Sequence, residues 1–308
     1  MEERVTTSDF ARKGWKGKVK DYFQLIKFTL SFMVVFSTVV SFLIAMNGLE
    51  ANTFTSSKLN LVLLLFVAGM LVTGAANSIN QILEKDSDAL MKRTLARPVA
   101  SGRMSKQEAT VFALVAGIAG VGMMWYFFNF QSAMLSLGSL FLYGFIYTPL
   151  KTVNSIAVLV GAIPGALPCL IGWVAATDSF SAGGWILFSI QLIWQFPHFW
   201  AIAWLAHEDY TKAGFRLLPG DKGPTKFTAL QTVIYSVLMI PVGMLPYLYN
   251  ISGVASFWIL LGCNLWMVYV SWMLYMKMDK ASARKVMFSS YIYLMIVLLS
   301  LFVSRPHV

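Results

Sequence analysis

The sequence predicts an all-α, polytopic membrane protein with nine transmembrane helices and a cytoplasmic N-terminus. Two observations predict this fold class. Of the 308 residues, 57% are hydrophobic and 12% are charged, whereas soluble domains have about 45–50% apolar and about 25% charged residues. The charged residues also cluster between long uncharged runs. At about 20 residues per crossing, the hydrophobic residues suffice for eight or nine helices, and too few remain for a separate soluble catalytic domain.

Each predicted helix corresponds to an uncharged run of sequence. Five runs are long enough for one crossing each, and two runs are long enough for two. In chain order they span residues 28–49, 59–83, 109–150, 152–177, 179–206, 227–276 and 286–304. The two long runs are expected to fold back at polar corners, near Asn129–Ser132 and near Asn250–Gly253. Pro197 is expected to kink the helix that contains it.

The basic residues test this count, because successive loops alternate between the two sides of a membrane. With nine helices, 22 of the 24 Lys and Arg residues lie on one side, and only Lys58 and Arg305 lie on the other. The positive-inside rule places the first side in the cytoplasm. We therefore expect a basic cytoplasmic tail over residues 1–21 and a transmembrane domain over residues 22–308, in the cell's inner membrane. The orientation of the chain in the membrane accounts for the basic residues and hence for the net charge of +10. No nucleic-acid partner is therefore expected.

The loop after the second predicted helix carries the first candidate site. Asn80, Glu84 and Asp88 are spaced four residues apart, so they share one face if that helix continues past Leu83. Two carboxylates at this spacing repel each other, and a cation between them would relieve the repulsion. Oxygen ligands of this kind suit Mg²⁺ together with a phosphate group. The alternative is a solvated loop whose charges only reflect membrane topology.

Further polar residues end other helices on the same predicted side of the membrane. Arg93 and Arg97 follow the acidic residues and are suited to bidentate contacts with phosphate. Tyr147 and Lys151 end the fourth predicted helix, and a group of four residues ends the sixth: Glu208, Asp209, Tyr210 and Lys212. This combination favours a lipid diphosphate as the substrate, with its charged end at the cytoplasmic mouth of an apolar cavity.

These motifs resemble those of the intramembrane, UbiA-type prenyltransferase superfamily. Asn80-x-x-x-Glu84-x-x-x-Asp88, with the arginines that follow, is similar to its first motif, and Tyr147-x-x-x-Lys151 is similar to its tyrosine-lysine motif. Other stretches resemble the branch that attaches a farnesyl chain to haem: Gly165-Ala-Leu-Pro168, Trp194-Gln-Phe-Pro-His198 and Asp209-Tyr-x-x-Ala-Gly214. The resemblance runs from about Lys27 to Arg305.

Three positions depart from the superfamily's pattern. Glu84 stands where an aspartate is usual. Leu205 stands four residues before Asp209, where a second aspartate is usual, so the second acidic site is reduced to Glu208 and Asp209. At the start of the first predicted helix, only Lys27 matches the usual lysine-proline-arginine.

The resemblance implies that the chain joins farnesyl diphosphate to a vinyl group of haem B, with Mg²⁺ as cofactor. A haem A synthase would then receive the product, haem O. The catalytic residues implied are Tyr147, Lys151, Glu84, Asp88 and Asp209. The implied metal ligands are Asn80, Glu84, Asp88, Glu208 and Asp209, and the implied diphosphate contacts are Lys27, Asn80, Arg93, Arg97 and Lys212.

His198 and Trp194 are the candidate haem-binding residues. An ionisable side chain inside a membrane span is costly and is a functional candidate for that reason. As a neutral imidazole, His198 could ligate the haem iron or hydrogen-bond a propionate. The alternative is a histidine that only hydrogen-bonds a neighbouring helix. The small residues of Gly161-Ala-Ile-Pro-Gly165 indicate close helix packing rather than chemistry.

Three other functions remain open on the residues alone. A sister enzyme that prenylates an aromatic acid for quinone synthesis would not need His198. A transporter would predict flux without prenyl transfer. A structural subunit of a respiratory complex would need no polar cluster of this kind.

Overall fold

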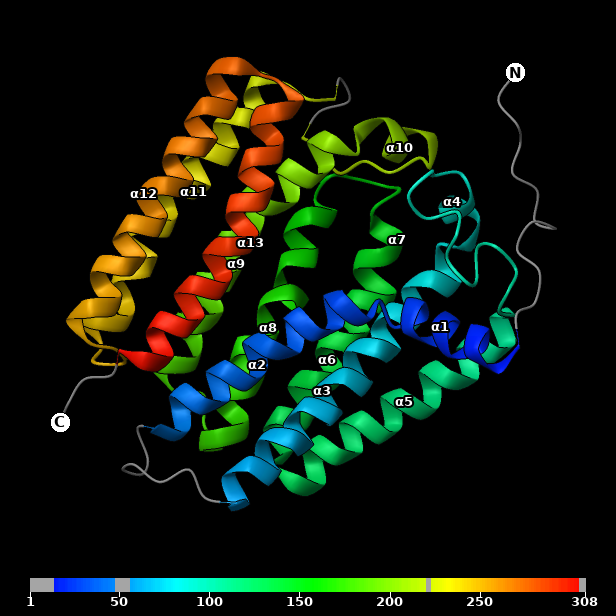
Figure 1. Cartoon of the computed structure of the whole chain (residues 1–308), viewed down its shortest axis with the longest axis horizontal. Helices are drawn as coiled ribbons and strands as arrows, with labels where there is room; N and C mark the ends of the chain where they lie inside the picture. The colour runs from blue at the N-terminus through cyan, green and yellow to red at the C-terminus, as the bar shows by residue number, and fades with distance from the viewer. Residues whose placement is uncertain (1–13, 48–55, 220–222, 305–308) are drawn as a thin grey trace.

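The structure is a computed structural model that describes residues 14–47, 56–219 and 223–304. Within these residues, nine helices are long and apolar enough to cross a membrane, and they pack into one bundle (Figure 1). This confirms the predicted all-α class and the predicted number of spans. The chain is therefore a multi-pass membrane protein. Arg305 and most of the predicted tail, residues 1–13, lie outside the described residues.

The spans follow the chain order expected from the uncharged runs. Eight spans are single helices: α2 (Phe28–Asn47), α3 (Ser56–Leu83), α5 (Lys106–Phe127), α8 (Ala157–Thr177), α9 (Ala182–Leu205), α11 (Lys226–Leu248), α12 (Val254–Lys277) and α13 (Lys280–Val303). The fourth span in chain order consists of three consecutive elements: α6 (Phe130–Phe141), η2 (Leu142–Tyr147) and α7 (Thr148–Leu150). Three short helices lie outside the spans: α1 (Trp15–Leu25), α4 (Lys85–Ala89) and α10 (His207–Lys212).

Both predicted corners lie where the sequence places them. Asn129 begins the fourth span as its N-cap, and its side chain accepts a hydrogen bond of 2.8 Å from the Ser132 amide. Asn250 adopts a left-handed backbone (φ 53°) at the end of α11, and Gly253 begins α12. Pro197 lies inside the continuous helix α9.

The predicted start of the last span was wrong by six residues. We expected the helix to begin at Val286, after the basic residues, but α13 begins at Lys280. Asp279 caps it by accepting a hydrogen bond of 2.6 Å from the Ser282 amide. A capped helix tolerates exposed basic residues in its first turns, so a charge-free run underestimates its length.

The centre of the bundle is α8, which packs against α2, α9 and α6 and is the most buried span. Its small residues permit the close approach. A Cβ atom at residue 165 would clash with the Gln195 side chain of α9, and one at residue 161 would lie 2.5 Å from Cε2 of Tyr147. The packing role predicted for Gly161 and Gly165 is confirmed.

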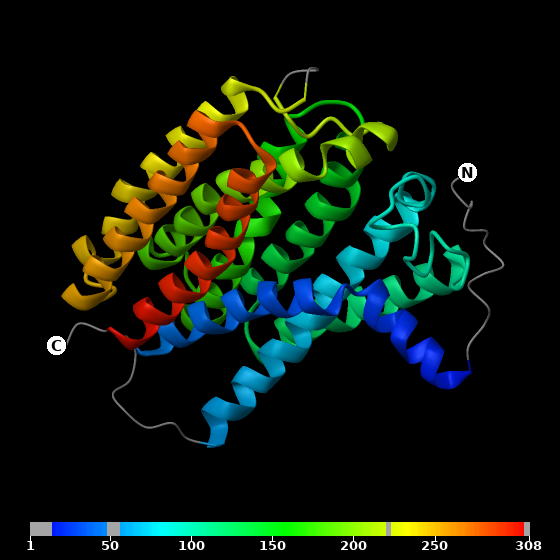
Figure 2. The ribbon, with the colours of Figure 1, turned by 45° about the horizontal axis from the view of Figure 1, so that its top comes forward.

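Helix α1 begins at Trp15, within the segment that we predicted to be a tail. Lys18 of α1 contacts Glu108 at 2.7 Å, and the buried Asp21 accepts a hydrogen bond of 2.8 Å from Arg103. The boundary that we placed after residue 21 therefore falls inside a helix that packs on the start of α5. The polar connections that contain α4 and α10 lie at one end of the bundle (Figures 1 and 2).

Candidate active site

The three acidic and amide residues predicted to share a face do so. Helix α3 ends at Leu83, but the helical hydrogen-bond pattern continues. The Glu84 amide donates to the Asn80 carbonyl at 2.9 Å, and the Asp88 amide donates to the Glu84 carbonyl at 2.7 Å. Asn80, Glu84 and Asp88 are all buried. The spacing in the sequence thus becomes one continuous polar face at the end of α3.

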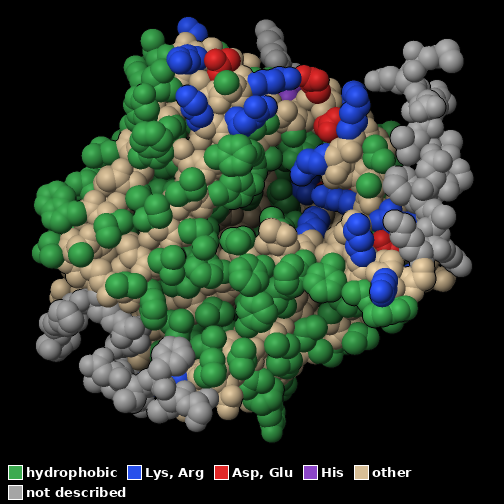
Figure 3. Space-filling model, in the orientation of Figure 1, with side chains coloured by type: hydrophobic (Ala, Val, Ile, Leu, Met, Phe, Trp, Pro, Cys, Tyr) green, Lys and Arg blue, Asp and Glu red, His purple; other side chains and the backbone are tan. Residues whose placement is uncertain are grey.

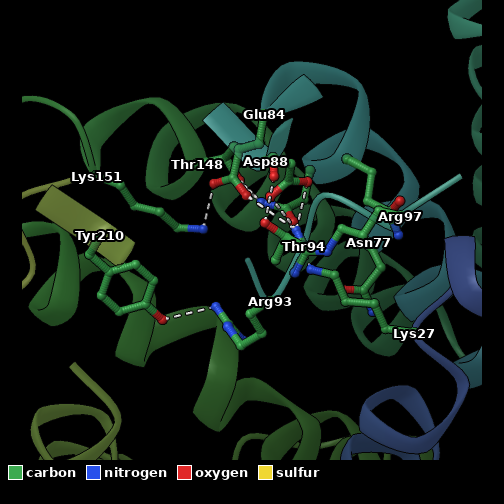
Figure 4. A network of polar contacts seen from close by, with 12 residues as sticks. Lys27, Asn77, Glu84, Asp88, Arg93, Thr94, Arg97, Thr148, Lys151 and Tyr210 are labelled. Atoms are coloured by element: carbon green, nitrogen blue, oxygen red, sulfur yellow. Dashed lines mark hydrogen bonds and ion pairs between the residues drawn. The ribbon is translucent and has the colours of Figure 1, made fainter. Parts of the chain in front are cut away.

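Three basic side chains contact this face, two of them from distant segments (Figure 4). The Lys151 ammonium lies 2.7 Å from a Glu84 oxygen. Arg97 Nη1 lies 2.7 Å from both carboxylate oxygens of Asp88 and 3.9 Å from Glu84. Lys27 donates to the Asn80 amide oxygen at 2.6 Å. We call these six residues, Lys27, Asn80, Glu84, Asp88, Arg97 and Lys151, the polar cluster.

Lys27 reaches the cluster because of an unusual backbone conformation. Its φ of 48° lies in the left-handed region, which costs a non-glycine residue energy. Helix α3 holds this joint between α1 and α2 in place. Asn77 donates to the Ile26 carbonyl at 3.2 Å, and Gln81 donates to the Leu25 carbonyl at 2.9 Å. The same helix therefore carries the acidic face and fixes the lysine that contacts it.

Burial changes the ionisation of the cluster. Desolvation raises the pKa of the Asp88 carboxyl, and the Arg97 guanidinium beside it partly opposes the rise. Desolvation lowers the pKa of the enclosed Lys27 ammonium well below its usual range, and the nearby charges of Arg97 and Lys151 lower it further. Both groups would gain from a bound partner of opposite charge.

Tyr147 lies beside Lys151 at the end of the fourth span. The Lys151 ammonium is 4.4 Å from the centre of the Tyr147 ring, a cation–π contact. The turn that carries the tyrosine is a π-helix, Leu142–Tyr147, a feature frequently found at functional sites. Pro149 lacks the amide that would bond the Phe145 carbonyl in an α-helix. The Thr148 hydroxyl donates to the Tyr143 carbonyl at 2.8 Å and accepts from Asn80 at 3.1 Å.

Arg93 extends the basic surface towards α10. Its guanidinium donates to the Tyr210 hydroxyl at 3.2 Å and lies 5.6 Å from the centre of that ring. The segment after α10 also touches the cluster, because the Arg216 amide donates to the Lys151 carbonyl at 2.7 Å. Tyr210 of α10 therefore contacts Arg93, one of the residues predicted to bind the diphosphate.

The second acidic group is not gathered with the first. Glu208 is exposed and pairs with Lys280 at 2.6 Å, which lowers the pKa of its carboxyl. Lys212 is exposed. The Asp209 side chain takes no part in the hydrogen bonds of the polar cluster in the described part of the chain. Accordingly, no group of three His, Cys, Asp or Glu residues suitable for a metal occurs within the described residues.

His198 and Trp194 lie together on α9, against α13. Their rings stack with centroids 5.0 Å apart, and the Tyr291 ring approaches His198 edge-on at 4.8 Å. His198 Nδ1 lies 2.7 Å from the Ser290 hydroxyl, and the Trp194 indole donates to the Ser290 carbonyl at 2.8 Å. The histidine is buried. The hydrogen bond to a neighbouring helix that we gave as the alternative therefore exists.

The same hydrogen bonds favour one tautomer of His198. The Ser290 hydroxyl has one proton, which it donates to the Met287 carbonyl at 2.6 Å. The hydroxyl oxygen can then only accept from Nδ1, which favours the neutral imidazole with its proton on Nδ1. The other ring nitrogen, Nε2, then has a free lone pair. A bond to the neighbouring helix thus prepares the histidine to accept a hydrogen bond or to ligate a metal.

One face of the molecule is hollowed beside a basic edge. Figure 3 shows a depression in the face of the molecule with Lys and Arg side chains along one edge and hydrophobic side chains along the others. The Tyr291 ring, which contacts His198 edge-on, is half exposed.

Several residues of the site were not identified in the sequence analysis. Asn77, Gln81 and Thr148 support the polar cluster, and Ser290 and Tyr291 support His198. Two signals were available. Asn77 and Gln81 are polar residues inside an apolar span, which is costly unless they have partners. Pro149 indicated a local break in the helix. Nothing in the sequence pairs Ser290 with His198, because 92 residues separate them.

A bundle of membrane helices with paired carboxylates and cations gathered at one end indicates an enzyme that is embedded in the membrane. Residues 34–296 match the UbiA prenyltransferase family, and the chain belongs to that family. It is 43% identical to a protoheme IX farnesyltransferase of Cytophaga hutchinsonii over 90% of this chain and 94% of the relative. It is 42% identical to a protoheme IX farnesyltransferase of Flavobacterium johnsoniae, over 89% and 90% of the two chains.

Solved structures share the fold. A digeranylgeranylglyceryl phosphate synthase superposes with a TM-score of 0.75 at 22% identity, covering 93% of this chain and 98% of that one. A UbiA homologue from Archaeoglobus fulgidus bound to GPP and Mg²⁺ superposes with a TM-score of 0.64 at 13% identity, covering 91% and 99%. The intramembrane prenyltransferase fold predicted from the sequence motifs is confirmed.

Proposed function

We propose that this chain transfers the farnesyl group of farnesyl diphosphate to a vinyl group of haem B. The allylic carbon–oxygen bond of the diphosphate breaks, the farnesyl carbon bonds one vinyl carbon, and water adds a hydroxyl to the other. The products are haem O, diphosphate and a proton. The protoheme IX farnesyltransferases at 42–43% identity support this function across about nine-tenths of the chain.

One observation carries the proposal at the level of the site. Four cations, Lys27, Arg93, Arg97 and Lys151, line the same edge as two carboxylates, Glu84 and Asp88. Of these cations, Lys151 is buried, Lys27 and Arg97 are partly buried, and Arg93 is exposed. Positive charge that exceeds the two carboxylates and is partly withdrawn from water is costly without an anionic ligand. A diphosphate supplies that anion, and the adjoining apolar hollow accommodates a prenyl chain.

The residues at the end of α3 fit Mg²⁺. Glu84, Asp88 and Asn80 supply two carboxylates and an amide oxygen on one buried face, and each oxygen already contacts a cationic side chain. Hard oxygen donors of this number suit an ion that also binds substrate phosphate oxygens and waters. Bound there, Mg²⁺ would act as a Lewis acid that stabilises negative charge on the diphosphate. Asp209 is proposed as a further ligand, and the exposed Glu208 as a weaker one.

The side chains of the cluster have distinct proposed roles. Lys151, Arg93 and Lys27 donate hydrogen bonds to the diphosphate and stabilise the charge that develops as it leaves. Arg97 neutralises Asp88 and orients it. The Tyr147 ring and the surrounding aromatic residues keep water from the cationic allylic carbon and stabilise its positive charge with their π faces. The exposed Lys212 is proposed to attract the substrate before binding.

His198 and Trp194 are proposed to bind haem B. The free lone pair of His198 Nε2 is suited to the haem iron, and the stacked indole of Trp194 fixes the plane of the imidazole. In this proposal, the vinyl group and the diphosphate meet in the hollow beside the basic edge.

The membrane context completes the proposal. The chain sits in the inner membrane with the mouth of the site towards the cytoplasm, because the basic loops lie at the end of the bundle that carries the polar cluster. Farnesyl diphosphate, with a soluble head and an apolar tail, enters at that face. Haem O leaves for a haem A synthase, the enzyme class that would oxidise it.

The test is to incubate the purified chain with haem B, farnesyl diphosphate and Mg²⁺ and to measure the extracted haem by mass spectrometry. We expect a species whose mass corresponds to farnesyl plus hydroxyl addition. A parallel incubation with 4-hydroxybenzoate replaces haem B. A prenylated benzoate without haem O would identify the chain as a quinone-pathway enzyme instead. If neither product formed, the result would contradict a prenyltransferase function.

A further inference from the structure

The clearest feature outside the active site is a groove between α12 and α13. It has a volume of about 620 Å³ and is lined by residues of these two helices alone. Its apolar walls include Trp266, Tyr269, Met273, Phe288 and Ile292, and four of these five are exposed. The groove lies on the outside of the bundle, because both helices pack inward against α9 and α11.

Three cations lie at one end of the groove. Lys277 is the last residue of α12, and Arg284 and Lys285 lie in the first turns of α13. In Figure 3, Lys and Arg side chains gather at this upper end of the molecule, with hydrophobic side chains below them. Within the described residues, none of the three forms an ion pair, whereas the neighbouring Lys280 pairs with Glu208 at 2.6 Å. Asp279, the nearest acid in sequence, caps α13 instead.

The depth of these cations in the membrane determines which part of a lipid they contact. Arg284 and Lys285 lie four and five residues beyond the start of α13, or about 6–8 Å into the span at 1.5 Å per residue. This distance corresponds to the head-group layer on one side of the hydrocarbon core. Trp266 lies eleven residues before Lys277, about 16 Å further along α12. The groove therefore runs from the head-group layer into the acyl-chain region.

One polar contact joins the two walls of the groove. The Trp266 indole donates to the Ser289 hydroxyl at 3.0 Å, across the two helices. This bond satisfies the indole and leaves an apolar face towards the groove. A ligand that fits must therefore be anionic at one end and apolar along the rest of its length.

We propose that this groove binds one anionic phospholipid. Its phosphate contacts Lys277, Arg284 and Lys285 at the head-group layer, and one acyl chain lies between α12 and α13 against Trp266 and Phe288. Charge complementarity at one end and apolar contact along the other distinguish this site from general attraction to the membrane surface. The site is independent of the proposed reaction, because none of its residues belongs to the polar cluster or the histidine site.

The experiment is native mass spectrometry of the purified full chain in detergent, titrated with phosphatidylglycerol or phosphatidylcholine. The wild-type chain is expected to bind one phosphatidylglycerol more tightly than phosphatidylcholine by at least about tenfold. A triple variant, Lys277→Gln with Arg284→Gln and Lys285→Gln, should lose that preference. Ala281→Trp, which fills the head-group end of the groove and keeps every charge, should lose it too.

A matched control separates the site from net charge. The triple variant Lys16→Gln, Lys20→Gln and Lys226→Gln removes the same number of exposed cations elsewhere and should keep the preference. If this control lost the preference for phosphatidylglycerol to the same extent, overall charge alone would attract the lipid. The proposed lipid site would then be overturned. The proposal is also overturned if the wild-type chain shows no preference, or if Ala281→Trp retains it. A dimer in the wild-type spectrum that Ala281→Trp abolishes would identify a second copy of the chain as the occupant instead.

Discussion

The polar cluster at the end of α3 and the histidine site between α9 and α13 bury polar groups in opposite ways. The cluster holds charged groups, and each carboxylate is paired with a cation: Asp88 with Arg97 of the same loop, and Glu84 with Lys151 of the fourth span. The histidine site holds neutral groups whose hydrogen bonds are completed within two helices. Removing a charge leaves its partner buried and unpaired, which costs more than removing one neutral hydrogen bond. Substitutions in the cluster should therefore have the larger effects.

Asp88→Ala should have the largest effect. It removes a proposed metal ligand and leaves the Arg97 guanidinium without the carboxylate that it contacts at 2.7 Å. We expect turnover, measured as haem O formed per minute, to fall by about 10³-fold or more. Thermal unfolding should show a lower midpoint, because a partly buried cation loses its partner.

Asp86→Ala is the matched control, because Asp86 lies two residues away on α4 and is exposed. It removes the same charge from the same helix and should keep nearly normal turnover. Equal losses in the two variants would mean that the net charge of the loop, rather than the paired carboxylate, supports the reaction.

Lys151→Gln should have the next largest effect. The side chain neutralises Glu84 at 2.7 Å and lies over the Tyr147 ring, and it is a proposed donor to the diphosphate. We expect kcat to fall by about 10²-fold. Lys212→Gln removes an equal charge from an exposed position. It should change mainly KM, and its effect should be smaller than that of Lys151→Gln. If Lys212→Gln lowered kcat as much as Lys151→Gln, the boundary of the polar cluster drawn from its contacts would be wrong.

Ser290→Ala tests the neutral site. Without the hydroxyl, His198 Nδ1 loses its acceptor, and the tautomer with a free Nε2 is no longer favoured. Haem affinity, followed by the Soret absorption of the titrated protein, should fall by about tenfold. His198→Ala should lower it further. Unchanged haem spectra and turnover in His198→Ala would rule out haem ligation and leave the residue a packing role.

The comparison also separates what the sequence could predict from what it could not. Asn80, Glu84 and Asp88 were predicted together because their relation is local: a four-residue spacing on one helix fixes their common face. The nine spans followed from runs of uncharged residues for the same reason. The start of α13 was missed because the hydrogen bond between Asp279 and Ser282, rather than hydropathy, sets where that helix begins.

Pairings between distant segments were not predictable in this way. Which cation meets which carboxylate depends on how α2, α3 and the fourth span pack, so Lys27 was expected near a diphosphate but its contact with Asn80 was not. Glu208 was grouped with Asp209 because they are adjacent, although its side chain turns away to Lys280. The hydrogen bond between His198 and Ser290 likewise depends on α13 lying against α9.

The smallest predicted effect concerns the one contact that joins helix packing to the chemistry. A methyl group at residue 161 would lie 2.5 Å from the Tyr147 ring, so Gly161→Ala must displace that ring from its place beside Lys151. We expect a decrease in kcat of a few-fold to about tenfold, in line with a misplaced catalytic group.

Gly138→Ala is the control for this substitution, because nothing lies within 4 Å of a Cβ atom there and the residue is also inside a helix. It should leave kcat unchanged and stabilise the chain by about 0.5–1 kcal/mol, since alanine loses less backbone entropy than glycine. If both variants were fully active, the position of Tyr147 would not limit the reaction, and Gly161 would serve only the packing of α8. A loss confined to Gly161→Ala would instead show that the close approach of α8 to the π-helix sets the position of the tyrosine.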